Sequence, residues 1–314
     1  MFTDPLFILS LAGMLGCIYI WIRQNVAEAK FNPLIEENLS SLGTIFFFVM
    51  IMSIWFNSGD LGLILFIAVI ISFIVFFIGI FYKNEVIKKS TRGTLIPLFI
   101  IFVLRSFLYE PYQIPSGSML PGLKVGDFIL VNKYEYGLKI NRVSKPLIEF
   151  NDPEYGEVVV FVPPHKPVPY IKRLIGKPGD SIKYINKKLY INDEIVLKDY
   201  EFTKEETVTR RYRYPSGKIE EVEEIEDIKF YTEELGGRSF IVRNSSAKTE
   251  YPQQWTVPKG HYFVVGDNRD NSNDSRQDVG FVPRNYFMGT ADYIWMTWEC
   301  WTCLPSFERA GKIN

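Results

Sequence analysis

Four apolar runs fill most of the first third of the chain and limit what it can fold into. They cover residues 5–22, 42–56, 61–82 and 94–109. A helix needs about 20 mostly apolar residues to cross a bilayer. Only seven of the 35 basic and seven of the 36 acidic residues lie in the first 110 positions. We therefore predict a transmembrane region of about four spans over residues 1–109, followed by a water-facing domain over 110–314.

The basic residues between these runs predict an orientation. The segment 83–92, which we expect to be a loop, carries Lys83, Lys88, Lys89 and Arg92. Short basic loops face the cytoplasm, so the fourth run should lead outward and place residues 110–314 on the extracytoplasmic side of the plasma membrane. A cleaved signal peptide over residues 1–29 is the weaker alternative, because no Lys or Arg precedes its apolar run.

Charge and cysteine content exclude some partners and leave one question open. The net charge of -1 gives no basic excess for nucleic acid. Cys300 and Cys303 form a C-x-x-C, but a zinc site would need two further ligands, and His165 and His261 are the only histidines. We expect no metal or cofactor, and either a local disulfide or two free thiols.

Beyond residue 110 the helical period gives way to short β-branched and aromatic runs bounded by Gly, Pro and Asn. The expected strands cover 128–131, 158–162, 170–175, 188–191, 239–243, 262–265 and 291–298. This pattern predicts a mainly β, antiparallel domain. A charged hairpin is expected over 208–225, closed at 215–217, with arginines on one arm and glutamates on the other. We therefore take about 187–252 as a polar β insertion outside the core of the domain.

Three segments of this domain carry candidate chemistry. Pro111–Pro121 holds three prolines and a glycine around Ser116 and Ser118, which favours an extended, turned backbone. In the second, Lys172 shares a strand face with Tyr170 and Leu174, where desolvation would lower the pKa of its amine. The third, Gly266–Arg276, holds three aspartates and two arginines and predicts a fixed ion-pair network.

Two other kinds of site fit these segments less well. Residues 270–281 cannot form an EF-hand calcium loop, because Ser275 stands where glycine is needed and Phe281 where glutamate is needed. A Ser-His-Asp triad is disfavoured because neither histidine lies beside a recognisable nucleophile motif. An amine base is the better-supported partner for a serine nucleophile here.

The combined motifs resemble the bacterial type I signal peptidase (leader peptidase) family. They are Ile-Pro-Ser-Gly-Ser-Met at 114–119, Gly-Asp-Phe-Ile-Leu-Val at 126–131, Tyr-Ile-Lys-Arg at 170–173, Gly-x-Pro-Gly-Asp at 176–180, Gly-Asp-Asn-Arg-Asp-Asn-Ser-x-Asp-Ser-Arg at 266–276 and Gly-Phe-Val-Pro at 280–283. The resemblance covers about residues 94–298, apart from the insertion. It implies a membrane-bound serine endopeptidase that removes signal peptides from exported preproteins at small-x-small sites. The four expected spans depart from familiar members, which have one or two.

The resemblance also implies a role for particular residues. Ser118 would be the nucleophile and Lys172 its general base, with the Ser118 N–H and the Ser116 hydroxyl as oxyanion hole. Ser272 would hydrogen-bond and orient Lys172, and Asp274 with Arg276 would hold their loop in place. The substrate pocket would be lined by Tyr112, Ile114, Met119, Leu123, Tyr170 and Ile171.

Competing functions remain at this point. A self-cleaving Ser-Lys repressor would need an N-terminal DNA-binding domain in place of apolar runs. A non-catalytic membrane-anchored binding protein on the same fold is the main alternative. The tryptophans at 295, 298 and 301 fit two interpretations equally well, part of the core of the domain or a patch that contacts the lipid bilayer.

Overall fold

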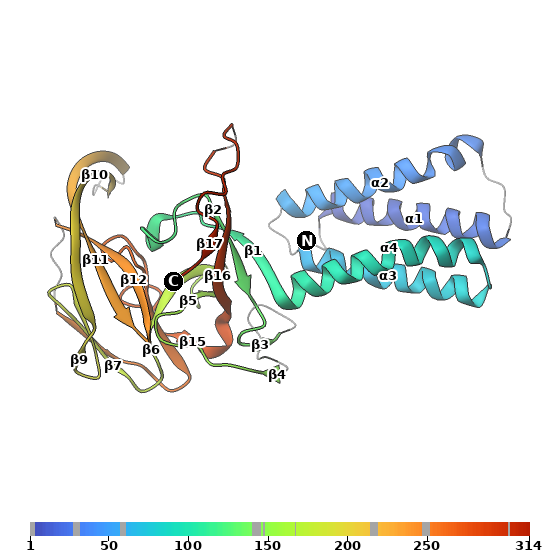
Figure 1. Cartoon of the computed structure of the whole chain (residues 1–314). Helices are drawn as coiled ribbons and strands as arrows, with labels where there is room; N and C mark the ends of the chain where they lie inside the picture. Colours follow the sequence, from blue (N-terminus) through green and yellow to red (C-terminus); the bar gives the residue numbers. More distant parts are fainter. Residues whose placement is uncertain are drawn as a thin grey trace. The chain divides into compact units, whose positions relative to one another are not determined.

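The computed structural model describes residues 4–27, 32–56, 61–139, 146, 148–166, 168–213, 219–246, 252–300 and 302–314. The chain divides into two compact units, Met1–Ser106 and Phe107–Asn314. The first is helical and the second is built from β-strands (Figure 1).

Each of the four apolar runs overlaps a helix of the first unit, although the helix ends differ from the predicted ones. The helices are α1 (Pro5–Ala27), α2 (Pro33–Phe56), α3 (Leu61–Phe81) and α4 (Glu85–Val103). Two stretches of the described helices, Pro5–Ala27 and Ile64–Phe81, are long and apolar enough to cross a membrane by length and composition. The membrane crossing of α2 and α4 stays a prediction.

The basic segment 83–92 is not the loop that we expected. Helix α4 already begins at Glu85, and the side chain of Asn84 caps it by accepting a hydrogen bond of 3.0 Å from the Ile87 N–H. An N-cap asparagine followed by an acidic first-turn residue favours a helix start here, which a search for apolar runs cannot detect. At the other end, a short π-helical segment, Leu104–Leu108, leads directly into a strand, so the run 94–109 covers only part of α4.

The second unit confirms the predicted antiparallel β domain. Its strands are β1 (Tyr109–Gln113), β2 (Asp127–Asn132), β3 (Gly137–Leu138), β4 (Ile148–Glu149), β5 (Val158–Phe161), β6 (Tyr170–Gly176), β7 (Ser181–Ile185), β8 (Lys188–Ile191), β9 (Glu194–Ile195), β10 (Leu197–Arg213), β11 (Ile219–Leu235), β12 (Arg238–Ser245), β13 (Gln253–Thr256), β14 (His261–Val265), β15 (Val282–Pro283), β16 (Phe287–Thr297) and β17 (Gly311–Lys312). Every expected strand overlaps one of them.

The largest sheet has the strand order β1-β2-β16-β5-β6-β14-β15, with β17 paired to β16. Strand β5 lies inside this sheet and is buried on both faces. Val158 and Val160 pack into one apolar cluster, whereas Val159 and Phe161 pack into another on the opposite side. A strand covered on both faces needs apolar residues at every position, which explains the unbroken run Val158–Phe161.

The insertion forms a sheet of its own, in the order β10-β11-β12. The predicted hairpin 208–225 is part of the longer β10–β11 ribbon (Figure 1). In its register, the Cα of Arg211 lies opposite that of Glu221. Its turn at 215–217 lies outside the described residues. Strands β7, β8, β9 and β13 form a further sheet.

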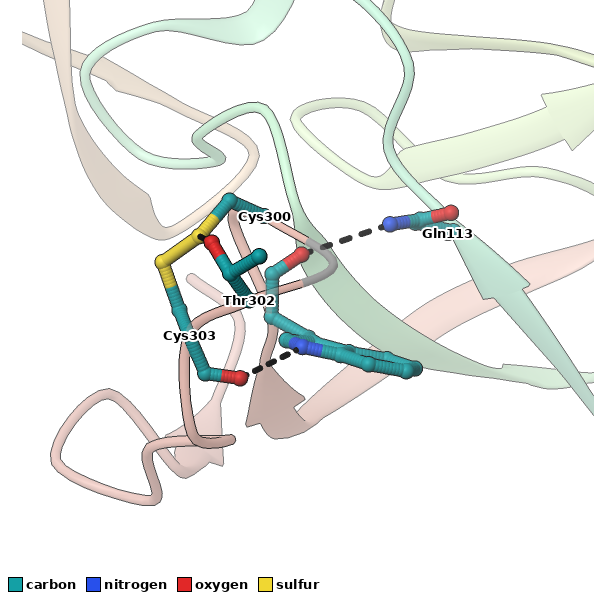
Figure 2. The surroundings of a disulfide bond; sticks show 5 residues. Gln113, Cys300, Thr302 and Cys303 are labelled. Atoms are coloured by element: carbon teal, nitrogen blue, oxygen red, sulfur yellow. Dashed lines mark hydrogen bonds between the residues drawn. A yellow bond between two sulfur atoms is a disulfide. The ribbon is translucent and has the colours of Figure 1, made fainter.

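The cysteines near the C-terminus form a disulfide (Figure 2). The Cα atoms of Cys300 and Cys303 are 5.2 Å apart. Trp298 lies beside this short loop and donates its indole N–H to the Cys303 carbonyl at 3.0 Å. The amide of Gln113, at the end of β1, donates to the Trp298 carbonyl at 3.4 Å. Of the two alternatives left open by the sequence, the structure therefore has the disulfide.

Candidate functional site

The segment after β1 turns sharply and presents Ser118. Backbone bonds fix its start: the Ile114 N–H donates to the Asp127 carbonyl at 2.8 Å, and the Gly126 N–H donates to the Ile114 carbonyl at 3.0 Å. The chain then forms a short 3-10 turn, Gly117–Met119, with Ser118 at its middle. The prolines around this turn prevent a longer helix, as the sequence predicted. Ser118 is buried, with 9% of its surface exposed.

Lys172 on β6 points to this serine. Its Nζ donates to the Ser118 Oγ at 2.7 Å and to the Ile171 carbonyl at 2.8 Å. Strand β6 is paired with β5 on one side and β14 on the other, so the position of Lys172 is set by a central strand of the main sheet. The lysine is 4% exposed.

Burial lowers the pKa of Lys172 from its ordinary 10.5 to about 8, although the nearby carboxylates of Asp274 and Asp267 act in the opposite direction. An amine with a pKa of about 8 is partly neutral near neutral pH, and a neutral amine has a lone pair that can accept a proton. A buried hydroxyl at 2.7 Å is placed to give up that proton. The pair can therefore provide an activated oxygen nucleophile without a histidine.

The loop that follows β14 forms the ion-pair network that the sequence predicted. Asp274 is fully buried and accepts hydrogen bonds from the Arg276 guanidinium at 2.9 Å and from the Gly266 N–H at 3.0 Å. Burial alone would raise the pKa of Asp274, but the ion pair with Arg276 and the bond from Gly266 outweigh it and hold the pKa below its ordinary value. Arg173 pairs with Asp267 in two bonds of 2.8 and 2.7 Å, which ties β6 to the start of the loop.

Asn268 is a site residue to which the sequence analysis gave no role. Its backbone N–H donates to the Ser118 carbonyl at 3.1 Å, and its side-chain amide donates to the Gly117 carbonyl at 2.9 Å. These two bonds fix the position of the 3-10 turn Gly117–Met119, which we call the nucleophile turn. Its place in the box 266–276 marked it as a member of a motif, but nothing in the sequence indicated that it contacts residues 117–118.

Comparisons with known proteins identify the family of this chain. A family model described as signal peptidase, peptidase S26, matches residues 85–298. The signal peptidase I of Pseudomonas aeruginosa is 43% identical over 247 residues, which cover 74% of this chain and 81% of that protein. The chain is a member of the signal peptidase S26 family.

Other signal peptidases extend the comparison. The signal peptidase I of Buchnera aphidicola from Acyrthosiphon pisum is 40% identical over 272 residues, covering 74% of this chain and 84% of that protein. A crystal structure of a signal peptidase I from Enterococcus faecalis is 25% identical in sequence. The match covers 45% of this chain and 98% of that one, with a TM-score of 0.27. The family assignment therefore rests on the sequences rather than on that superposition.

The two remaining serines expected at the site, Ser272 and Ser116, differ in their exposure to solvent. Ser272 is buried and lies beside Asp274, where it contributes to the low pKa of that carboxyl. The hydrogen bonds found for Lys172 go to Ser118 and Ile171, so an orienting bond between Ser272 and Lys172 stays a prediction. Ser116 is exposed at the start of the nucleophile turn, with its backbone extended.

Five of the six expected pocket residues pack into one apolar cluster. Ile114, Met119 and Leu123 are almost fully buried, and Tyr112 and Ile171 are half-buried at its edge. Tyr170 is half-buried as well, but it packs against the neighbouring cluster around Phe161. The three buried residues can form an apolar floor close to Ser118, with the half-buried ones as walls.

The insertion takes a larger part in the signal-peptidase site than expected. We took 187–252 as a polar insertion outside the core, whereas β11 and β12 bury Glu233 and Phe240 against the loop and β6. Glu233 pairs with Arg269, and the Phe240 ring lies 3.7 Å from the Arg173 guanidinium carbon. The charges at 208–225 led us to treat the whole segment as polar, but Glu233 lies farther along β11 and Phe240 lies on β12, outside the charged hairpin.

The structure also bears on the two other kinds of site considered from the sequence, a histidine base and a metal site. His165 is exposed and its ring packs 5.9 Å from that of Tyr170. Within the described residues, no group of three or more His, Cys, Asp or Glu side chains could hold a metal ion.

Proposed function

We propose that this chain removes N-terminal signal peptides from exported preproteins as a membrane-anchored serine endopeptidase. The observation that carries the proposal is the buried contact of 2.7 Å between the Lys172 Nζ and the Ser118 Oγ. Its similarity to proteins named signal peptidase I supports the same substrate class. The non-catalytic alternative is not favoured, because both members of the pair are present and in contact.

The proposed reaction begins with neutral Lys172. The amine takes the proton of Ser118 as its oxygen attacks the scissile carbonyl, and the negative charge on the resulting oxyanion is stabilised by the Ser118 N–H and the Ser116 hydroxyl. One such donor is worth roughly 3–4 kcal/mol of transition-state stabilisation. Lys172 then gives its proton to the leaving amine, and an acyl-enzyme remains on Ser118. A water deprotonated by Lys172 hydrolyses this ester, and the proton returns to Ser118 to restore the starting state.

The apolar floor near Ser118 supports a preference for small substrate side chains. Ile114, Met119 and Leu123 fill the space below the turn, so a pocket above them would be shallow. We expect small residues at the first and third positions before the cut. An extended substrate would lie along the segments 112–118 and 168–172 and bond to their exposed backbone groups.

The helical unit supports membrane anchoring, and its finer arrangement is part of the proposal. We propose four spans with the β unit on the extracytoplasmic side, where preproteins emerge. A reporter enzyme that is active only outside the cytoplasm, fused after Asn314, tests this orientation. Activity of the fusion is expected, and an inactive but well-expressed fusion would reverse the topology.

The direct test uses the full chain in detergent and a purified preprotein with an Ala-x-Ala cleavage site. We compare the wild type with Ser118→Ala, Lys172→Met and the control Lys188→Met, whose lysine is exposed on β8. Cleavage at the expected bond by the wild type and the control, with a loss above about a thousandfold in the other two, supports the dyad. Activity that survives Lys172→Met would point to another base. A wild type that cuts nothing would favour the binding protein.

A further inference from the structure

Glu233 on β11 is a fully buried carboxylate of the insertion that reaches the loop after β14. It accepts a hydrogen bond of 2.9 Å from the Arg269 guanidinium at one oxygen and a second, shorter one at the other. The two side chains are 0% and 1% exposed. A two-point contact between a planar guanidinium and a carboxylate fixes both side chains in one orientation.

A second cation completes the surroundings of this carboxylate. The Lys198 Nζ lies 3.5 Å from Glu233 and donates to the Asn244 side chain at 2.7 Å. A buried carboxylate without partners would strongly destabilise the fold. The contacts of Glu233 with Arg269 and Lys198 are therefore expected to persist in the folded protein. The three strands of the insertion each contribute to it: Lys198 from β10, Glu233 from β11 and Asn244 from β12.

Arg269 is fixed at both ends. Its guanidinium is held by Glu233, and its carbonyl accepts a hydrogen bond of 2.6 Å from Arg276, the partner of Asp274. Its backbone N–H donates to the Arg243 carbonyl on β12 at 3.0 Å, and the Arg243 N–H donates to the Asp267 carbonyl at 2.9 Å. Strand β12 therefore runs beside residues 267–269 and sets the position of all three.

The residue between these anchors is Asn268, which holds the Ser118 and Gly117 carbonyls. A shift of Arg269 therefore moves Asn268, and a shift of Asn268 moves the turn that carries the nucleophile. On the other side of the loop, Phe240 of β12 packs over Arg173, the neighbour of Lys172 on β6. The insertion thus contacts Arg173, which follows Lys172, and residues 267 and 269, which flank the asparagine bonded to the Ser118 carbonyl.

We propose that Glu233 is a positioning residue for the Ser118–Lys172 dyad, acting through Arg269 and Asn268. The inference rests on the proposed peptidase function and assigns to the insertion a part in holding the catalytic geometry. Loss of the carboxylate leaves Arg269 buried without its partner, loosens Asn268 and lets the nucleophile turn move away from Lys172.

The test compares Glu233→Gln with Glu234→Gln in the full chain in detergent, with the preprotein substrate used above. Glutamine keeps the size of the side chain and removes its charge. Glu234 is the neighbouring residue on the same strand, but it is exposed. For Glu233→Gln we expect kcat to fall by about tenfold or more with KM within about twofold, because Glu233 does not touch the substrate. Glu234→Gln should stay within about twofold of the wild type in both.

The pH profile separates positioning from simple loss of folded protein. The charged groups that act on Lys172 are Asp267 and Asp274, both in the loop that Glu233 helps to hold. If the nucleophile turn loosens, water reaches Lys172 and the rising limb of kcat/KM moves to higher pH. A smaller folded fraction would instead lower the rate at each pH by the unfolded fraction measured there, without changing the pKa of Lys172. A double variant with Asn268→Ala should lose less than the product of the two single losses, because both act on the same turn.

The possible outcomes bear on different claims. A wild type that cuts nothing overturns the proposed function itself. An active wild type with a folded Glu233→Gln variant that keeps its kcat and pH profile overturns only the role of Glu233. So does a double variant whose losses multiply. If Glu233→Gln does not fold, Arg269→Lys, which keeps the positive charge but cannot form the two-point contact, is measured against the same criteria.

Discussion

Gly266 lies directly against the backbone of the nucleophile turn. A methyl group on Gly266 would come within 2.5 Å of the Ser118 carbonyl oxygen and would also collide with the Ser272 hydroxyl. The N–H of the same glycine donates to Asp274 at 3.0 Å. One residue without a side chain thus brings β14, the nucleophile turn and the Asp274–Arg276 pair together, because only glycine permits this backbone approach.

Gly266→Ala should therefore damage both stability and catalysis. The Ser118 carbonyl is backbone and cannot rotate away, so the turn must shift relative to Lys172. Overpacking of this kind costs about 1–3 kcal/mol of folding stability, and we expect kcat/KM to fall by about tenfold or more. Thermal unfolding and preprotein cleavage measure the two effects.

Gly122→Ala is the matched control for this change, because Gly122 lies just after the same turn. A methyl group there would meet its nearest atoms, the Met119 carbonyl and the Asp267 carboxylate, at 3.7 and 3.8 Å, which is ordinary contact. We expect activity within about twofold of the wild type. Equal behaviour of the two variants would show that the close approach at Gly266 is not important.

The pH dependence of cleavage should follow Lys172. The base works only when the amine is neutral, and burial brings its pKa to about 8. We therefore expect kcat/KM to rise with pH and to level off above about 8, with one proton lost along the limb. Initial rates from pH 6 to 10 in buffers of constant ionic strength provide the measurement. A flat profile across pH 8 would exclude Lys172 as the base.

Much of the β unit could be predicted because its strands have strong local signals. The runs 158–162 and 262–265 are short, apolar and rich in β-branched and aromatic residues, as expected of strands buried on both faces, and both form inner strands of the main sheet. The start of α4 was missed for the opposite reason. Capping by Asn84 and the charged first turns favour a helix, but they are invisible in a search for apolar runs.

In the site, too, residues with a local sequence signal could be predicted and residues placed by tertiary contacts could not. Ser118 and Lys172 lie in recognisable motifs, and the structure brings them into contact although 54 positions separate them. Asn268 and Glu233 depend instead on tertiary contacts. Glu233 meets Arg269 only because the register of β11 against β12 brings that part of the insertion beside the loop. No local pattern distinguishes this glutamate from its exposed neighbour Glu234.

The disulfide should matter little for the reaction. Cys300 and Cys303 are three positions apart, and closing so short a loop restricts the unfolded chain by only about 2 kcal/mol. Beside the disulfide, which Figure 2 shows, the indole of Trp298 donates to the Cys303 carbonyl, and the Trp298 carbonyl accepts from Gln113. We expect the variant with both cysteines changed to serine to keep kcat within about twofold and to unfold at a slightly lower temperature. Cys17→Ser is the control, and a large loss of kcat in the double-serine variant would contradict this view.

Lys172 should lower the stability of the fold that it serves. Its pKa falls from 10.5 to about 8 on folding, because burial penalises the charged amine. Below pH 8 the folded protein must bury a charged amine away from water, which lowers the free energy of unfolding by about 3 kcal/mol. Between pH 8 and about 10.5 the unfolded chain binds the extra proton, so this cost disappears as the pH rises. Lys172→Met should therefore be more stable than the wild type at pH 7, and its advantage should shrink as the pH approaches 10. Urea unfolding of both proteins at pH 7 and pH 10 measures the difference. An advantage that is the same at both values would mean that the amine is not desolvated in the folded protein.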